Sequence, residues 1–137
     1  MADEDAVFEV MDIVNVVFDL PATSPVVNLR EAAAPFRAIS FPIGLPEAQA
    51  IALALHKERG TRPGTHELFN DVLAVTGVDI VAVRLTGARD GAIHAELDLM
   101  GPRGHEVLDC RPSDGIALAV RQSPPAPLLC DVTLLEA

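Results

Sequence analysis

The chain has 137 residues, 50% of them hydrophobic and 22% charged, which suits one folded domain with a hydrophobic core and excludes a disordered chain. Asp and Glu number 20 against 10 Lys and Arg, so the formal net charge is −10. This balance excludes a broad basic face of the kind that binds long nucleic acid by charge alone. It leaves room for a small basic site, because Lys57, Arg59 and Arg62 lie close together in the sequence.

The N-terminal segment predicts a cytoplasmic protein without a membrane span. Residues 1–20 carry six acidic residues and no basic ones, whereas a signal peptide opens with a basic region and an apolar stretch. We expect residues 1–6 to be flexible and the domain core to occupy about residues 10–135. The two cysteines, Cys110 and Cys130, lack metal-type spacing and are expected to be reduced.

The N-terminal half reads as strands followed by helices. Segments rich in Val, Ile and Phe predict strands at residues 7–19, 25–29 and 36–43. The apolar period then becomes helical from Pro46, which suits a first helical turn, until Gly60. A second helix is predicted over residues 65–77, with Thr65 as its N-cap and with one shared face formed by Leu68, Val72 and Leu73.

The C-terminal half returns to strands, which are predicted at residues 78–85, 92–99 and 105–110. In the second of these, apolar and polar residues alternate, so one face should be buried and the other wet. Ser113 is expected to cap a third helix over residues 113–122, and residues 127–137 form a last strand or a short helix. This grouping predicts the α+β class: a single compact domain whose mixed or antiparallel sheet packs against about three helices.

Three polar motifs are richer in special residues than a plain scaffold requires. The first, Ile43-Gly44-x-x-Glu47, reads as a turn glycine before a helix whose Glu47 complements the N-terminal dipole. The second, Arg62-Pro63-x-Thr65-His66, can hold an anion at a helix N-terminus while His66 moves a proton. The alternative is that Thr65 caps the helix and His66 only hydrogen-bonds a nearby carbonyl.

The third motif runs from Asp109 to Asp114 and admits two interpretations. Structurally it is a strand-to-helix corner fixed by a pair between Arg111 and a carboxylate. Functionally, Asp109 and Asp114 can hold a hard divalent cation while Arg111 meets a phosphate.

These three motifs, in this order, resemble the bifunctional nuclease domain family over nearly the whole chain. The resemblance implies a compact, often dimeric α+β domain and an activity that cuts RNA and DNA. The family's polar motif residues fall on Glu47, Arg62, Thr65, His66, Asp109, Arg111, Ser113 and Asp114, and its structural positions include Gly44, Pro63 and Pro112. The chain departs from the pattern at Glu67, where many relatives have aspartate.

The resemblance therefore predicts a phosphodiesterase that uses Mg²⁺ or Mn²⁺ and no organic cofactor. We expect catalytic roles for His66, Asp109 and Asp114. Phosphate binding is assigned to Arg62, Arg111, Thr65 and Ser113, and metal binding to Asp109, Asp114 and Glu67. The acidic composition favours a short oligonucleotide over long duplex DNA as the RNA or DNA partner.

The sequence has no Trp or Tyr and only five Phe, which argues against a base-stacking platform. The alternative function is non-catalytic: an oligomeric scaffold or a module that binds a small anionic ligand. In that case the Arg–Asp motifs are structural corners and a dimer interface is the functional surface.

Overall fold

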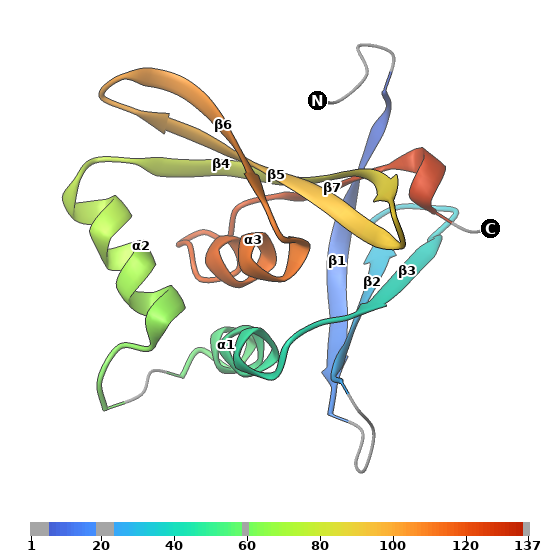
Figure 1. The fold of residues 1–137 in the computed structure, drawn as a ribbon, viewed down its shortest axis with the longest axis horizontal. Helices are drawn as coiled ribbons and strands as arrows, with labels where there is room; N and C mark the ends of the chain where they lie inside the picture. Colours follow the sequence, from blue (N-terminus) through green and yellow to red (C-terminus); the bar gives the residue numbers. More distant parts are fainter. Residues whose placement is uncertain (1–5, 19–23, 59–60, 136–137) are drawn as a thin grey trace.

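The computed structural model of the chain describes residues 6–18, 24–58 and 61–135. In this part of the chain a seven-stranded sheet has the order β3-β2-β1-β7-β4-β5-β6. The sheet is strongly bent, so that β1–β3 and β4–β6 enclose the helices from two sides (Figure 1). The fold is α+β, as predicted. Residues 1–5, where a flexible segment is expected, and Gly60, the predicted helix end, lie outside the described residues.

The N-terminal half follows the sequence prediction closely. Its strands pair antiparallel, and they are β1 (Phe8–Val17), β2 (Val26–Glu31) and β3 (Ala38–Pro42). The two helices that follow are α1 (Leu45–Leu55) and α2 (Thr65–Val75). Helix α1 ends about five residues before the predicted boundary, with His56 as its C-cap.

The C-terminal half forms a second antiparallel unit and then closes the sheet. Its elements are β4 (Asp79–Arg89), β5 (Ala92–Gly101), β6 (Gly104–Cys110), α3 (Pro112–Ala119) and β7 (Leu128–Asp131). Strand β7 pairs antiparallel with β1 and parallel with β4, so it joins the two halves. A short 3₁₀ helix, Val132–Leu134, follows β7, and the last segment is therefore both a strand and a short helix.

Helix α3 is the centre of the core. It packs on β4 and β5, and both α1 and α2 pack against it. Its residues from Gly115 to Ala119 are buried, and a Cβ atom at Gly115 would lie 3.0 Å from Val83 Cγ1 and 3.1 Å from Cys110 Sγ. The glycine therefore lets α3 lie close against the sheet, which fixes the position of its first turn.

Helix α2 departs from its predicted packing. Leu73 packs against the core, but Leu68 is 55% exposed and Val72 is 53% exposed. The physical reason is that α2 borders α3 at one edge of the domain, so a single flank of the helix is covered (Figure 1). The sequence period identified the helix correctly and overestimated its buried face.

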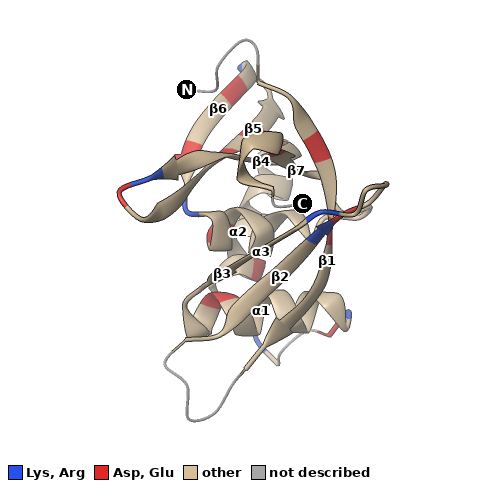
Figure 2. Cartoon of the chain, turned by 90° about the vertical axis from the view of Figure 1, so that its right-hand side faces the viewer, with Lys and Arg blue, Asp and Glu red and all other residues tan. Residues whose placement is uncertain are grey.

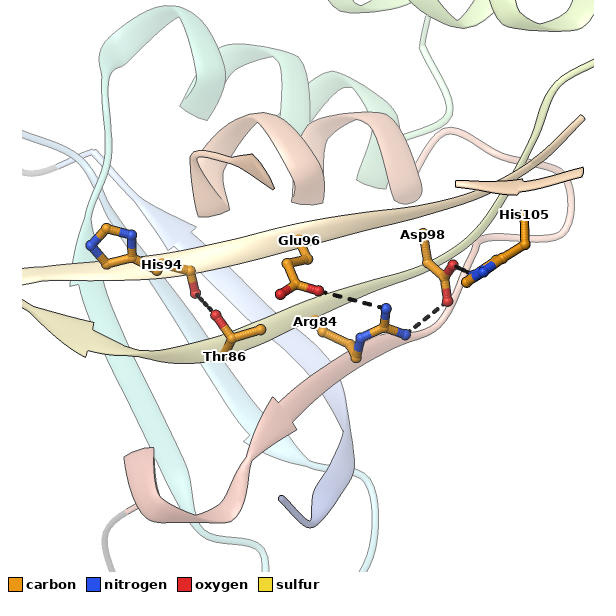
Figure 3. A network of polar contacts seen from close by, with 6 residues as sticks. All are labelled: Arg84, Thr86, His94, Glu96, Asp98 and His105. Carbon is orange, nitrogen blue, oxygen red and sulfur yellow. Dashed lines mark hydrogen bonds and ion pairs between the residues drawn. The ribbon is translucent and has the colours of Figure 1, made fainter. Parts of the chain in front are cut away.

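The polar side chains of β5 are also less exposed to solvent than the alternation of apolar and polar residues predicts. Asp98 is 7% exposed and accepts a hydrogen bond from Arg84 Nη1 at 2.8 Å and another from His105 (Figure 3). Glu96 lies 3.9 Å from Arg84. Burial alone would raise the pKa of Asp98, but the hydrogen bonds from Arg84 and His105 outweigh it and lower the pKa. Pairing with Arg84 and His105 thus allows the Asp98 carboxylate to be buried on the face of the sheet away from α3.

Replacing Asp98 with asparagine should lower the free energy of unfolding at pH 7 by about 2 kcal/mol, because charged hydrogen bonds are lost. The pKa of Asp98 is lowered on folding, so the unfolded state takes up the proton first as the pH falls. The wild type should therefore lose more stability between about pH 5 and pH 3 than Asp98→Asn does. Urea titrations across this range measure the difference. Asp90→Asn, in the exposed β4–β5 turn, is the control, and parallel pH curves for the wild type and Asp98→Asn would contradict the assignment.

The remaining global features agree with the composition. Among the described residues, no helix is long and apolar enough to cross a membrane. Basic residues are scattered over the fold in the view of Figure 2 rather than gathered on one face. Cys110 and Cys130 are free, as predicted, and burial raises the pKa of their thiols to about 11 and about 12. Such thiols are poor nucleophiles at neutral pH.

Candidate functional site

Three helix N-termini define the site, and each contributes one polar side chain from its first turn to the cluster. In α3, Arg111 is the N-cap, Pro112 follows it, and Asp114 lies in the first turn. Because Gly115 seats α3 against the sheet, the Asp114 carboxylate is held at a fixed place. The predicted cap, Ser113, is wrong: Ser113 is buried inside the helix, and Arg111 takes the extended N-cap conformation.

In α1 the N-cap is Gly44, Pro46 lies in the first turn, and the polar side chain is Glu47. A Cβ atom at Gly44 would collide with the Glu47 carboxylate, so the glycine makes room for the folded-back side chain. As a result the Glu47 side chain is only 10% exposed.

In α2 the N-cap is Gly64, so the prediction of Thr65 as N-cap is wrong by one residue. Thr65 begins the helix and His66 follows in the first turn. No side chain caps any of the three helices at its N-cap residue. All three N-termini consequently direct partial positive charge toward their first-turn side chains.

The three first turns meet. His66 Nε2 lies 2.9 Å from Asp114 Oδ1, and Arg111 Nε donates to Asp114 Oδ2 at 2.8 Å. Arg111 Nη2 also lies 3.8 Å from Glu47 Oε1. These side chains, with Arg121 and Glu67, line a pocket of about 350 Å³, which we call the polar pocket.

The Asp114 carboxylate is ionised and anchored. Burial would raise its pKa, but hydrogen bonds from Arg111 and His66 outweigh that effect and hold the pKa below its usual value. The Asp114 carboxylate in turn raises the pKa of Arg111. The Asp114 side chain is still 31% exposed and Arg111 is 65% exposed, so a ligand in the polar pocket can reach both.

Glu47 is the least satisfied group of the site. Within the described residues, its carboxylate has the 3.8 Å ion pair with Arg111 and receives no hydrogen bond. Ligand atoms of Glu47, His66 and Asp114 all lie within 4.8 Å of one another. Two ligands held at right angles about 2.1 Å from an ion are about 3 Å apart, close to the separation of His66 and Asp114. One imidazole and two carboxylates are therefore a candidate donor set for a divalent ion such as Mn²⁺ or Mg²⁺.

Comparison with known proteins agrees with this arrangement. The sequence pattern of the bifunctional nuclease domain matches residues 27–137, which include all three first turns. The chain belongs to the bifunctional nuclease domain family. It is also 36% identical over 113 residues to an uncharacterized protein found in two strains of Mycobacterium tuberculosis. The match covers 82% of this chain and 66% of those proteins, so the chain spans just under two thirds of their length.

The family's other motif residues are spread around this site. Thr65 lines the polar pocket, whereas the exposed Arg62 and Pro63 lie in the preceding loop and do not. Ser113 lines a different cavity beside Gly44 and Pro112. Glu67 is buried and pairs with Arg121 at 3.5 Å, so it faces a cation of the chain itself.

Asp109 lies beside the site but outside the group of donors, because it lines a neighbouring cavity together with His66 and Asp114. Its neighbour Cys110 pairs with Ala95 on the face toward α3, because Cys110 Sγ approaches Gly115. Side chains alternate along a strand, so Asp109 starts on the opposite face together with Glu96. Asp109 is consequently not in the donor cluster found among the described residues.

Sequence reasoning did not assign the roles of two residues of the polar pocket. Glu47 reads as a motif residue that complements the helix dipole, and its burial beside Asp114 indicates a donor. Arg121 lies within the predicted third helix and has no role predicted from sequence; its Nε is buried and unpartnered among the described atoms, and it lines the pocket. The position of each residue along the chain does not show that Glu47 and Arg121 line the same pocket.

Proposed function

We propose that this protein is a metal-dependent nuclease that hydrolyses phosphodiester bonds in the polar pocket. The observation that supports this most is the meeting of Glu47, His66 and Asp114 beside the exposed Arg111. A bound Mn²⁺ or Mg²⁺ would lower the pKa of a water molecule and neutralise developing phosphate charge.

Within that proposal each side chain has a separate role. Glu47 and Asp114 supply carboxylate oxygens for the ion, and His66 either completes the ligand set or holds a proton at Nε2. Arg111 is free to turn one side of its guanidinium to a phosphate, because its side chain is 65% exposed. The net charge of −10 favours a short oligonucleotide.

The test is single-turnover cleavage of labelled single-stranded RNA and DNA in Mg²⁺, Mn²⁺ or EDTA. The wild type should cut in metal and not in EDTA, and a His66→Ala variant shown to be folded should lose the activity. Equal residual cutting by both proteins would identify a contaminant and refute the nuclease.

A second candidate is a non-catalytic oligomeric module that binds a small anion in the same pocket. It is favoured by the exposed apolar flank of α2, formed by Leu68, Phe69, Val72 and Val75, which suits a subunit interface of a homodimer. For this candidate we expect phosphate-containing ligands to bind without any cleavage, and sedimentation equilibrium to give a dimer.

Gly44→Ala tests whether the placement of Glu47 matters. The added Cβ forces the Glu47 carboxylate away from His66 and Asp114, so we expect Mn²⁺ affinity and cleavage to fall about tenfold. Gly87→Ala is the matched control, because a Cβ atom at Gly87 in β4 would have nothing within 4 Å and Gly87 does not line the polar pocket. Isothermal titration with Mn²⁺ and the cleavage assay give the two readouts. Equal behaviour of the two variants would mean that the position of Glu47 has no part in the site.

A further inference from the structure

A second cavity lies directly behind the His66–Asp114 pair. It has a volume of about 370 Å³ and shares Thr65, His66, Arg111 and Asp114 with the polar pocket. Its remaining walls are mainly apolar, with one carboxylate: Phe69 from α2, Leu97 from β5, Leu108, Asp109 and Cys110 from β6, and Leu118 from α3. We call it the apolar pocket.

We propose that the apolar pocket holds one nucleobase of a single-stranded substrate, beside the phosphate that is cut; this rests on the nuclease proposed above. The two cavities share the side chains that would handle the phosphate, so they lie next to each other. A nucleotide has the same division, with a charged phosphate next to a flat apolar base.

The chemistry of the walls supports this occupant. Phe69 and Leu108 are each 49% exposed, so large apolar surfaces at the pocket face water when the protein is free. A base that covers Phe69 removes both apolar surfaces from water and gains a stacking contact. The sequence argues against a platform of several aromatic residues, but the apolar pocket requires only one, Phe69.

This placement also predicts a preference for single strands. A base inside the apolar pocket cannot remain stacked and paired in a duplex, and drawing it out costs free energy. Cleavage of a duplex should therefore be at least about tenfold slower than cleavage of the same strand alone.

The other possible occupant is a second copy of this chain, since Phe69 lies on the exposed flank of α2. Leu68 separates the two cases. It is 55% exposed on the same flank but does not line the apolar pocket. A subunit interface across α2 would use Leu68 and Phe69 alike, whereas a base pocket uses Phe69 alone.

The experiment measures binding and cleavage of two fluorescein-labelled probes: a single-stranded hexanucleotide and the same strand with every base replaced by an abasic sugar. Anisotropy in EDTA gives the affinity without turnover. Phe69→Ala should weaken binding of the base-containing strand about tenfold and leave the abasic strand unchanged. Leu68→Ala should behave as the wild type, and Phe69→Leu, which keeps the apolar wall, should be intermediate.

Three results would overturn the base pocket: equal loss on both strands, loss in Leu68→Ala together with a smaller oligomer in sedimentation, or equal cleavage of the two strands by the wild type. Failure of the nuclease is distinguishable, because it abolishes cleavage of both strands while the anisotropy comparison still decides the pocket.

Discussion

Asp114→Asn should lower kcat/KM for metal-dependent cleavage by about 10³-fold, the largest effect on activity that we expect from one side chain. The substitution keeps the volume of the side chain but removes the charge that orients both His66 and Arg111 and that, in the proposed function, would bind an ion. The loss should appear mainly in kcat, with weaker Mn²⁺ binding in the absence of substrate. Single-turnover rates over a range of Mn²⁺ concentrations separate the two effects.

The control is Asp79→Asn, which removes an equal charge from an exposed position at the start of β4. It should cut as the wild type does. Circular dichroism must show both variants folded at the assay temperature. If Asp114→Asn retains more than about a tenth of the activity, Asp114 is a structural corner and the catalytic assignment fails.

Leu85→Ala should lower the free energy of unfolding by about 3 kcal/mol, the largest effect on stability that we expect from one truncated side chain. Leu85 is fully buried in β4, where it pairs with Ala95 of β5 on one side and Cys130 of β7 on the other. The cavity would open in β4, next to β7, the strand that joins the two halves of the sheet, and Ala95 is too small to fill it.

Urea denaturation at pH 7 measures this cost. Leu68→Ala is the matched control, because the same atoms are removed from a side chain that is 55% exposed, and its effect should stay within about 0.5 kcal/mol. Similar values for the two leucines would show that the Leu85 side chain is not packed in the hydrophobic core.

Asp114→Asn should lose activity and Leu85→Ala should lose stability, and this difference distinguishes a residue of the site from a residue of the core. Asp114 is partly exposed and held by charged hydrogen bonds, so its replacement should change chemistry more than stability. Leu85 does not line the polar pocket, so its replacement should reduce activity only through the fraction of unfolded protein.

The local period of the sequence was sufficient to identify most elements. Segments rich in Val, Ile and Phe identified β1 to β3, and glycine-containing turns separated β4, β5 and β6. Such patterns depend on local backbone preference and on one buried face. They therefore predict the ends of helices and the N-cap residues less accurately than the elements themselves. Thr65 and Ser113 look like N-cap residues because of their hydroxyl groups, yet Gly64 and Arg111 are the residues with the extended N-cap conformation.

Burial of individual side chains was harder to predict. The polar alternation of β5 does not reveal that Asp98 is buried, because that requires Arg84 from β4 and His105 from β6. The apolar stripe of α2 does not reveal that Leu68 and Val72 are half exposed, because that depends on where the edge of the domain falls.

The sequence by itself determined the fold class, the elements and three polar motifs that each begin a helix. Only the tertiary structure decided which of their side chains share a site. Glu47, His66 and Asp114 meet because α1 and α2 both pack on α3, whereas Asp109 lines a neighbouring cavity and is not one of the three donors. Local backbone preference acts over a few residues. A cluster of donors from three helices depends instead on contacts between segments up to 67 positions apart, and the packing of side chains between those segments specifies these contacts.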